Sequence, residues 1–517
     1  MAKDPGEGAG TCIRMETAEQ TSTFFDAITL ERILAPGNLL EALEQVERNK
    51  GAPGVDGMRT DELRDWIRSH PGQLTNAIRT GKYRPKPVKR VTIPKQEKGK
   101  FRNLGIPTVI DRLVQQAVAQ VMNWSYETIF SDSSCGFRPH RGAQDAILRC
   151  LTHADRGNVW TADMDLAKFF DTVNHSRLIR KLSDRIRDGK VVSLIHRMLK
   201  SGIDTGEEIL RPTEGLMQGG PLSPLLANIY LDELDKELEK RGHCFVRYAD
   251  DLIILCKSRR AAERTLESVT KFVEGRMKLR VNRDKSGVAH LTRDVKFLGF
   301  GFSRSRKLER YIPTVHAKSK KRLADSLKLI LARNRKGSLD EVKESLRTKL
   351  TGWAAYFRWA HFQGWARGLD EWIRRRIRQL LWRTWKKVHT RYRALLRLGC
   401  EHRTALRWAN TRKGSWRIAN SLVLAATLKN DFLKAHGWVW LSLVAKPAVF
   451  VKPSFRESEK IPNSVRPHLD LCPSPPDSGE LSTVALPVLC VSFSGLSQAS
   501  GIISQLRRAS GCTHLCG

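Results

Sequence analysis

Hydrophobic residues recur at helical spacing along several stretches of the chain and alternate with polar residues along others. Leu39, Leu43 and Val46 repeat at three- and four-residue steps, which predicts a helix that ends in the Gly-rich turn 51–57. A basic stretch over 84–94 has the pattern of a strand. Longer amphipathic patterns predict helices over 109–128, 175–200, 222–241 and 260–276.

Short β-rich segments alternate with these helices up to about residue 300. They predict strands over 158–163, 244–248, 252–256 and 295–300. Because 244–248 and 252–256 are apolar and are separated by a short acidic turn, we expect them to form a hairpin. The chain therefore combines helices and strands in the manner of an α+β protein.

The pattern changes after about residue 312, where ten of the thirteen tryptophans lie among many arginines, with helical periodicity. In 371–393, nine Lys and Arg residues stand against a single acidic residue. These charges cannot share one face of a helix, so we expect the helix to meet phosphate or solvent on more than one side. Because Trp372, Trp382 and Trp385 interleave with the charges, the pattern favours an RNA-binding helix over a merely solvated one.

Composition points to a polyanionic partner. The 517 residues include 90 Lys and Arg against 54 Asp and Glu, a formal net charge of +36 that nucleic acid would neutralise. A hydrophobic content of 41% argues against a disordered basic protein. The ten cysteines lack paired spacing, the N-terminus lacks an apolar signal core, and no apolar run is long enough to span a membrane. We therefore expect a reduced, cytoplasmic protein that does not enter a membrane.

Two acidic segments can support phosphoryl transfer. Transfer to a 3′ hydroxyl uses two divalent cations roughly 4 Å apart, held by carboxylates from different strands. The first segment is an apolar strand that ends at Asp163 and runs on through Asp165 to Asp171. The second is the hairpin with Tyr248-Ala-Asp-Asp251 at its tip. An acidic turn alone is common in proteins, but together with Asp163 it indicates a metal-dependent site.

The Tyr248-Ala-Asp-Asp251 hairpin resembles the catalytic motif of reverse transcriptases, and the strand ending at Asp163 resembles their first metal-binding motif. Further blocks extend the resemblance in order through about residues 31–440. They are 51–57, 105–112, 134–141, 218–228 and 297–300. Together they are similar to bacterial group II intron reverse transcriptases rather than to retroviral ones.

The fold that this resemblance implies is α+β: a right-hand polymerase with fingers, a palm built on an antiparallel sheet, and a helical thumb/maturase domain. We expect residues 1–30 to form a poorly ordered lead. The other expected segments are an N-terminal extension with fingers (31–110), a palm with the remaining fingers (111–311), a thumb/maturase domain (312–390), a DNA-binding segment (391–445) and a Ser/Pro-rich tail (446–517).

The resemblance also implies roles for single residues. It assigns Asp163, Asp250 and Asp251 to two catalytic Mg²⁺ ions, and it leaves Asp165 as a supporting acid. Lys285 resembles the lysine that could protonate the leaving pyrophosphate, and an exposed lysine at a helix end is the alternative interpretation.

Nucleotide-binding residues follow from the same resemblance. Lys95 and Arg102 have a spacing around a turn that suits a finger hairpin clamping the incoming triphosphate, and a solvated basic loop is the alternative. Gln218 resembles the residue that touches the incoming nucleotide. Either Phe169 or Phe170 is expected to form the steric wall against a 2′ hydroxyl, although such an aromatic pair is also common in a core.

The chain departs from the family pattern before the Gln-Gly-Gly turn, where the family usually has proline and this chain has Met217. Because proline would stiffen the loop at little entropic cost, methionine is expected to loosen it. The acids and Gln218 are intact, so we still expect an active polymerase.

The helical region carries a second resemblance. Segments 351–358 and 372–378 look like the maturase domain, which in that family grips intron RNA, and 410–417 resembles the small DNA-binding segment that follows it. Trp353, Tyr356 and Phe357 are expected to pack internally. The phosphate contacts are assigned to Arg374, Arg375, Arg376 and Arg378.

Many relatives end in a Cys/His-bearing nuclease, and the tail of this chain lacks the paired spacing of such a module. Its cysteines are Cys472, Cys490, Cys512 and Cys516. The chain therefore resembles the endonuclease-lacking class.

The expected function is RNA-directed DNA polymerisation with maturase activity, in group II intron splicing and retrohoming. The expected partners are intron RNA, a DNA target or primer and deoxynucleoside triphosphates, and a homodimer is left open. Two alternatives are a domesticated reverse transcriptase in phage defence or repair, and a splicing factor with a vestigial polymerase site.

Overall fold

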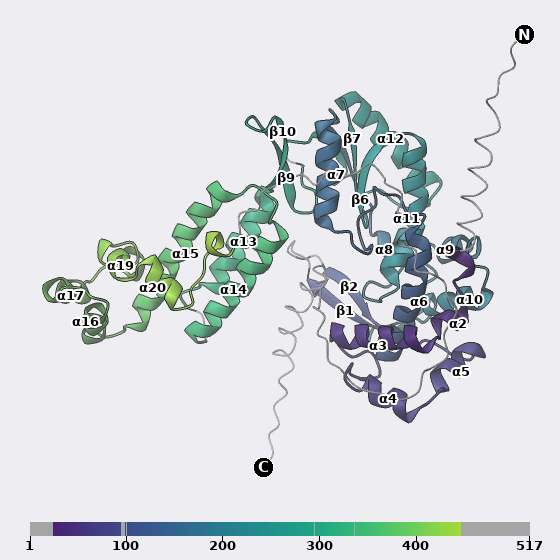
Figure 1. Cartoon of the computed structure of the whole chain (residues 1–517), viewed down its shortest axis with the longest axis horizontal. Coiled ribbons are helices and arrows are strands. Elements are labelled where there is room, and N and C mark those ends of the chain that lie inside the picture. The colour runs from purple at the N-terminus through teal and green to yellow at the C-terminus, as the bar shows by residue number, and fades with distance from the viewer. Residues whose placement is uncertain (1–23, 95–98, 100, 294, 335–336, 446–517) are drawn as a thin grey trace, which may run out of the picture. The chain divides into compact units, whose positions relative to one another are not determined.

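The central feature of the computed structural model, which describes residues 24–94, 99, 101–293, 295–334 and 337–445, is a four-stranded antiparallel sheet. The strand order is β6-β7-β3-β8. The strands are β6 (Cys244–Tyr248), β7 (Asp251–Cys256), β3 (Trp160–Asp165) and β8 (Gly287–His290) (Figure 1). The predicted hairpin therefore forms, and the first acidic strand lies next to it.

Side chains alternate between the two faces of this sheet. Met164 and Ile254 point into a core shared with helices on one side, whereas Ile253 and Leu255 point into a second core on the other side. The helices of the first side are α6 (Val109–Glu127), α11 (Ser223–Lys240) and α12 (Arg259–Gly275). On the second side α7 (Ala143–Asp155) contacts β6 and β7 (Figure 1).

The N-terminal helices pack on α6. They are α2 (Leu30–Ile33) and α3 (Pro36–Asn49), which includes the helix predicted from Leu39 to Val46. Two short helices follow, α4 (Leu63–Ser69) and α5 (Gln73–Arg79). One carboxylate joins this region to a distant helix. Asp188 accepts from the backbone N–H of Leu30 at 2.7 Å and from that of Lys190 at 2.9 Å.

The basic stretch 84–94 contributes an inner strand to a second sheet, which has the order β2-β1-β4-β5. Its strands are β1 (Val88–Pro94), β2 (Phe101–Ile106), β4 (Ile203–Asp204) and β5 (Ile209–Leu210). Strands β1 and β2 pair antiparallel, with Arg102 opposite Ile93. Predicted residue Lys95 lies outside the described residues.

Three predicted elements are wrong in their extent. The helix expected over 175–200 is two helices, α9 (His175–Ser183) and α10 (Gly189–Leu199), because the Asp188 side chain caps a new N-terminus. The helix expected through 393 ends at Thr384, where α15 (Gln363–Thr384) gives way to α16 (Val388–Arg397).

The strand expected over 295–300 is instead a tight turn. Leu298 and Gly299 have φ values of +50° and +84°, which no strand contains. Strand β9 (Phe300–Ser305) begins only after this turn and pairs with β10 (Arg310–Val315). The apolar run 295–300 is nevertheless buried at Val295, Phe297 and Phe300, which explains why it has the composition of a strand.

The remaining helices surround aromatic side chains. Trp353 contacts Phe357 and Phe362, with ring centroids 4.7 and 5.1 Å apart, and Tyr356 also packs on this core, as predicted. These helices are α13 (Ala317–Ile330), α14 (Leu339–Tyr356), α17 (His402–Ala409), α18 (Ser415–Ile418), α19 (Leu422–Thr427), α20 (Asn430–Ala435) and α21 (Leu441–Val444). Within the described part of the chain, no helix is both long and apolar enough to cross a bilayer.

Candidate active site

The strand register brings carboxylates to one edge of the central sheet. In the β3–β7 pair Asp165 lies directly opposite Asp251, and Asp163 lies opposite Ile253, so these three acids project from the same face. Asp250 occupies the turn between β6 and β7. Helix α7 packs against the other end of this face, which leaves Asp251 exposed and Asp163 and Asp165 partly buried.

Burial and the charges of neighbouring acids raise the pKa values of three of these carboxylates. Partial burial raises the pKa of Asp163 to about 7, and the charge of Asp251 adds to that shift. The pKa of Asp251 rises to about 6, because surrounding protein limits its hydration even though one side is open, and because Asp250 lies close by. Burial also raises the pKa of Asp250. Asp165 contributes to all three shifts, so it is the neighbour that the other acids share.

Asp165 is held in place by the turn that follows α12. Its carboxylate accepts from Asn282 Nδ2 at 2.9 Å and lies 3.6 Å from Lys285 Nζ, while its backbone N–H donates to Ser286 Oγ at 3.0 Å. Lys285 is therefore an exposed lysine paired with a carboxylate of the candidate site.

This donor set suits divalent cations. Carboxylates are hard oxygen ligands, and burial together with neighbouring carboxylates raises the pKa values of these acids. No group of three or more Asp, Glu, His or Cys side chains in the described ranges is already arranged to hold a metal ion.

A buried arginine, which the sequence did not identify, supports the acidic turn. Arg247 of β6 is 1% exposed, and its Nε donates to Asp235 Oδ1 of α11 at 2.7 Å. Its Nη1 donates to the carbonyl of Ala249 at 3.0 Å. Ala249 has a φ of +58°, which is unfavourable for a residue with a Cβ, so this bond stabilises a strained turn. The sequence contains one sign of this ion pair, which is a single arginine within an apolar strand, because a buried cation needs an acidic partner.

The segment 133–136 clamps the same turn from the side. Cys135 N–H donates to the carbonyl of Arg247 at 2.8 Å, and Asn228 Nδ2 donates to the carbonyl of Gly136 at 2.9 Å. A Cβ on Gly136 would lie 2.3 Å from the nitrogen of Ala249, so only glycine permits this approach. Two of the recognised sequence blocks, 134–141 and 218–228, thus position the catalytic hairpin.

The Gln-Gly-Gly turn docks on strand β2. Gly105 N–H donates to the carbonyl of Gln218 at 2.8 Å, and Leu216 N–H donates to the carbonyl of Phe170 at 2.6 Å. Gly219 has a φ of +124°, and a Cβ there would lie 2.4 Å from the Gly105 oxygen. Met217 reaches over Gly105, where an added Cβ would lie 2.6 Å from the methionine Cε. Backbone bonds and this packing hold the turn in place, and the loosening expected from Met217 stays a prediction.

The other predicted nucleotide contacts lie around this turn. Arg102 is exposed, and its charge lowers the pKa of Asp250 against the effect of burial, so it lies within electrostatic reach of the acids. Phe169 is 2% exposed and packs against Tyr230 in the core, whereas Phe170 is only partly buried. Both belong to the short helix α8 (Phe169–Thr172), and exposure favours Phe170 as the steric wall.

The four arginines predicted to bind RNA lie against neighbouring parts of the protein. They are Arg374 over Trp440 (5.4 Å), Arg375 over Trp416 (3.7 Å), Arg376 over Trp416 (4.8 Å) and Arg378, whose Nε donates to the carbonyl of Leu428 (3.2 Å). Their contact with RNA stays a prediction.

A basic cavity of about 840 Å³ lies where the DNA-binding segment was predicted. Residues 411–417 form most of its lining, together with Arg333 and Gln379. Arg412, Lys413 and Arg417 give this lining its positive charge.

The comparison with known families agrees with this geometry. Residues 93–302 match the family described as reverse transcriptase (RNA-dependent DNA polymerase), and residues 320–399 match the group II intron maturase-specific domain. The fold and the site are thus those of an RNA-directed DNA polymerase, a class that uses divalent metal ions and nucleic-acid substrates.

Individual relatives narrow the class. Protein YkfC of Escherichia coli is 33% identical over 347 residues, which cover 58% of this chain and 90% of that protein. Group II intron-encoded protein LtrA of Lactococcus lactis is 29% identical over 332 residues, which cover 52% of this chain and about half, 55%, of that protein. The chain belongs to the group II intron reverse transcriptase/maturase family.

A solved structure titled "Partial Cas6-RT-Cas1--Cas2 complex" aligns with 28% identity and a TM-score of 0.32 over 48% of this chain and 42% of that chain. The fold assignment does not depend on it.

Proposed function

We propose that this chain copies RNA into DNA with two Mg²⁺ ions held by Asp165, Asp250 and Asp251, and that it acts in the splicing and retrohoming of a group II intron. The observation that carries the proposal is the register of β3 and β7, which sets Asp165 directly across from Asp251 and beside the turn with Asp250. The raised pKa values of the clustered acids support it, because bound cations would relieve that repulsion.

This proposal changes the metal ligand on strand β3. Asp163 lies one pleat further from the turn than Asp165, opposite Ile253 rather than opposite an acid. The charge of Lys296 counteracts the rise in its pKa. We therefore assign Asp163 to the electrostatic support of the site and Asp165 to the cations, the reverse of the roles expected from the sequence.

The surrounding residues fit the steps of nucleotide addition. Two divalent cations would activate the primer 3′ hydroxyl and hold the triphosphate. Arg102 would contact the triphosphate, Gln218 would contact the nucleotide from the docked turn, and Phe170 would exclude a 2′ hydroxyl. Lys285, which already lies 3.6 Å from Asp165, would donate a proton to the leaving pyrophosphate.

The splicing role is supported by the helical region. Its maturase match, the basic cavity lined by 411–417 and the net charge of +36 all favour a structured RNA as one partner and a DNA target as another.

Primer extension on an RNA template, with Mg²⁺ and deoxynucleotides, tests the proposal. Wild type should extend the primer, and Asp250→Ala and Asp165→Asn should each lower the rate by about 10³-fold or more, because a metal ligand is lost. Asp163→Asn should retain measurable extension. RNA affinity, measured on each variant, should be unchanged and thereby report intact folding.

Two outcomes would contradict the proposal in different ways. Loss of extension in Asp163→Asn with activity retained in Asp165→Asn would return the metal-ligand role to Asp163. If wild type binds RNA tightly but extends no primer, the polymerase assignment is wrong and the chain is a splicing factor with a vestigial site.

A further inference from the structure

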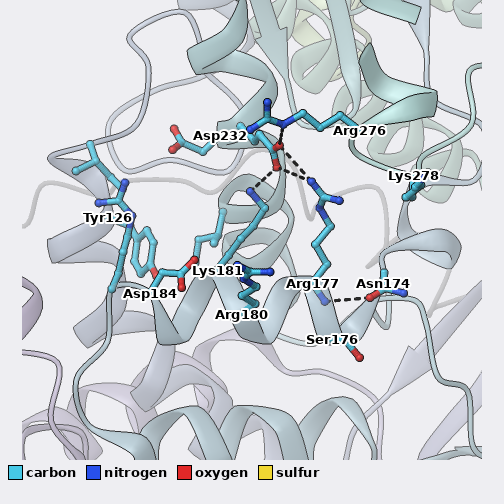
Figure 2. A pocket seen from close by; sticks show the side chains of 14 residues that line it. Tyr126, Asn174, Ser176, Arg177, Arg180, Lys181, Asp184, Asp232, Arg276 and Lys278 are labelled. Carbon is cyan, nitrogen blue, oxygen red and sulfur yellow. Dashed lines mark hydrogen bonds and ion pairs between the residues drawn. The ribbon is translucent and has the colours of Figure 1, made fainter. Parts of the chain in front are cut away.

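A pocket of about 930 Å³ lies apart from the candidate active site (Figure 2). It is lined by the end of α6, one face of α9, part of α11 and the turn after α12. None of its lining residues belongs to the strands β3, β6 or β7, which carry or flank the acids. Its volume falls within the roughly 300–1,000 Å³ of small-molecule sites.

The lining carries an excess of positive charge. Six basic side chains stand against three acidic ones, a formal excess of three positive charges. The basic residues are Arg177, Arg180, Lys181, Arg185, Arg276 and Lys278, and the acidic residues are Asp184, Asp232 and Glu233. Such a lining attracts an anion.

One carboxylate gathers three of these cations side by side. Glu233 lies 3.2 Å from Arg177 Nη2, 2.6 Å from Lys181 Nζ and 3.0 Å from Arg276 Nε. The labelled side chains of Arg177, Lys181 and Arg276 converge on one carboxylate in Figure 2. A single negative charge cannot neutralise three positive ones, so the cluster is fixed in position and remains cationic.

Two further cations are open to solvent. Arg180 lies on the same face of α9 as Arg177 and Asp184, and Lys278 lies on the turn after α12 (Figure 2). Both are exposed, and neither forms an ion pair with another described residue. They therefore extend the cationic cluster along the rim of the pocket.

The lining also contains polar atoms that lack a partner. Tyr126 is 1% exposed, and its hydroxyl has no hydrogen-bond partner among the residues the structure describes. The Oδ1 atom of Asp232 is likewise buried and unpartnered. Burying a polar group without a partner is unfavourable, so such groups in a pocket point to a ligand that satisfies them.

We propose that this pocket binds a nucleotide, either free or as one residue of a bound RNA. Its phosphate meets the rim formed by Arg177, Arg180 and Lys278. Its sugar or base supplies a hydroxyl or amino donor to Asp232 and an acceptor to the Tyr126 hydroxyl. A bare phosphate would leave these two inner groups unsatisfied. The proposal does not depend on the polymerase assignment, because no catalytic residue takes part.

A crosslinking and binding experiment on the full chain tests the site. A 20-nucleotide single-stranded RNA containing 4-thiouridine, in EDTA, should crosslink to peptides containing Tyr126 or residues 174–185. Adenosine, cytidine, guanosine and uridine 5′-monophosphates are added as competitors. Competition assigns the site to a free nucleotide, whereas crosslinking that resists the monophosphates assigns it to a residue of a longer RNA.

Matched variants separate phosphate contacts from entry into the pocket. Affinity for RNA falls as salt rises, so the slope of log affinity against log salt is negative. In the double variant Arg180→Ala/Lys278→Ala this slope should be less steep by about 1.4, because each lost phosphate contact contributes about 0.7 for a single strand. Tyr126→Phe should weaken binding by about 2- to 10-fold and leave the salt slope unchanged. Lys257→Ala/Arg260→Ala removes two exposed cations outside the pocket and serves as the control.

Three results would overturn the proposal. The crosslinks could fall entirely outside the lining residues, or the rim variant could match the control variant in salt slope. Tyr126→Phe could also bind as tightly as wild type while the rim variant binds weakly, in which case RNA passes over the rim without entering the pocket. A urea unfolding midpoint equal to that of wild type reports correct folding of every variant, whether or not the chain extends a primer. A failure of this site is therefore distinguished from a failure of the polymerase assignment, which primer extension tests separately.

Discussion

Charged side chains have opposite surroundings at the acidic edge of the central sheet and on the basic helix α15. At the sheet edge, Asp163, Asp250 and Asp251 lie close enough to other carboxylates to raise their pKa values. On α15, Arg375 and its neighbours lie over tryptophan rings and donate to backbone carbonyls. The acids are thus poised for cations from outside the chain, whereas these arginines already contribute to the fold. A dense run of one charge does not by itself identify a binding surface.

The largest effect is expected where the acidic edge depends on an internal ion pair. Arg247→Met leaves Asp235 buried without its partner and should lower the free energy of unfolding by about 3–5 kcal/mol. Urea unfolding measures this change. The double variant Arg247→Met/Asp235→Leu should recover most of the loss, and the exposed Arg260→Met should have little effect. An unchanged midpoint in Arg247→Met would show that the pair does not stabilise the hairpin.

A smaller effect is expected at the docked turn beside the acids. Gly219→Ala places a Cβ 2.4 Å from the Gly105 oxygen at a φ of +124°, so Gln218 must shift. Primer extension should lose about 10- to 100-fold in kcat/KM for deoxynucleotides, with RNA affinity unchanged. Gly189→Ala, which meets no atom within 4 Å, is the matched control. Equal kinetics in the two variants would exclude a positioning role for the turn.

The acidic edge also predicts a pH dependence. Because the pKa of Asp163 rises from 3.8 to about 7 in the fold, ionising it opposes folding, and the penalty grows as pH rises from about 4 to about 7. In EDTA, wild type should therefore lose stability relative to Asp163→Asn over this range, by roughly 1–3 kcal/mol. Millimolar Mg²⁺ should reduce the difference. A difference that is independent of pH would show that Asp163 is not held in a crowded, poorly hydrated site.

The smallest effect is expected on the basic helix α15. Arg375→Ala removes a guanidinium that lies 3.7 Å from the Trp416 ring and should lower the stability of the helical region by about 0.5–2 kcal/mol. The salt slope of RNA binding should stay as in wild type if Arg375 serves packing. If the salt dependence of RNA binding becomes less steep by about 0.7 and the stability is unchanged, Arg375 instead contacts a phosphate.

The sequence predicted most elements whose pattern has a single period. The strand over 244–248 and the helix over 109–128 agree with β6 and α6, because a short apolar run next to a turn and a helical repeat both report burial. The run 295–300 failed because burial alone does not distinguish a strand from a turn with positive φ. The break at 184–188 was missed because a capping aspartate interrupts a pattern that remains amphipathic on both sides.

The sequence predicted which segments form the candidate site, but it could not rank the acids within them. Asp163 and Asp165 share one face at a spacing of two, so periodicity cannot choose between them, and only the pairing with Asp251 ranks them. Arg247 and Asp235 are twelve residues apart on a strand and a helix, so their contact exists only in the folded chain. The carbonyls that accept from Arg375 and Arg378 lie 41 and 50 residues further along, beyond the reach of a local pattern.

The double role of Asp188 has a consequence for synthesis of the chain. Its carboxylate caps α10 and also binds the backbone of Leu30, 158 residues earlier. As the chain leaves the ribosome, Leu30 emerges long before residue 188, so the N-terminal segment must wait until helix α6 and strand β3 have been translated before this bond can form. Slow codons between these positions would lengthen the time during which the N-terminal segment lacks this anchor and depends on its packing against α6 alone.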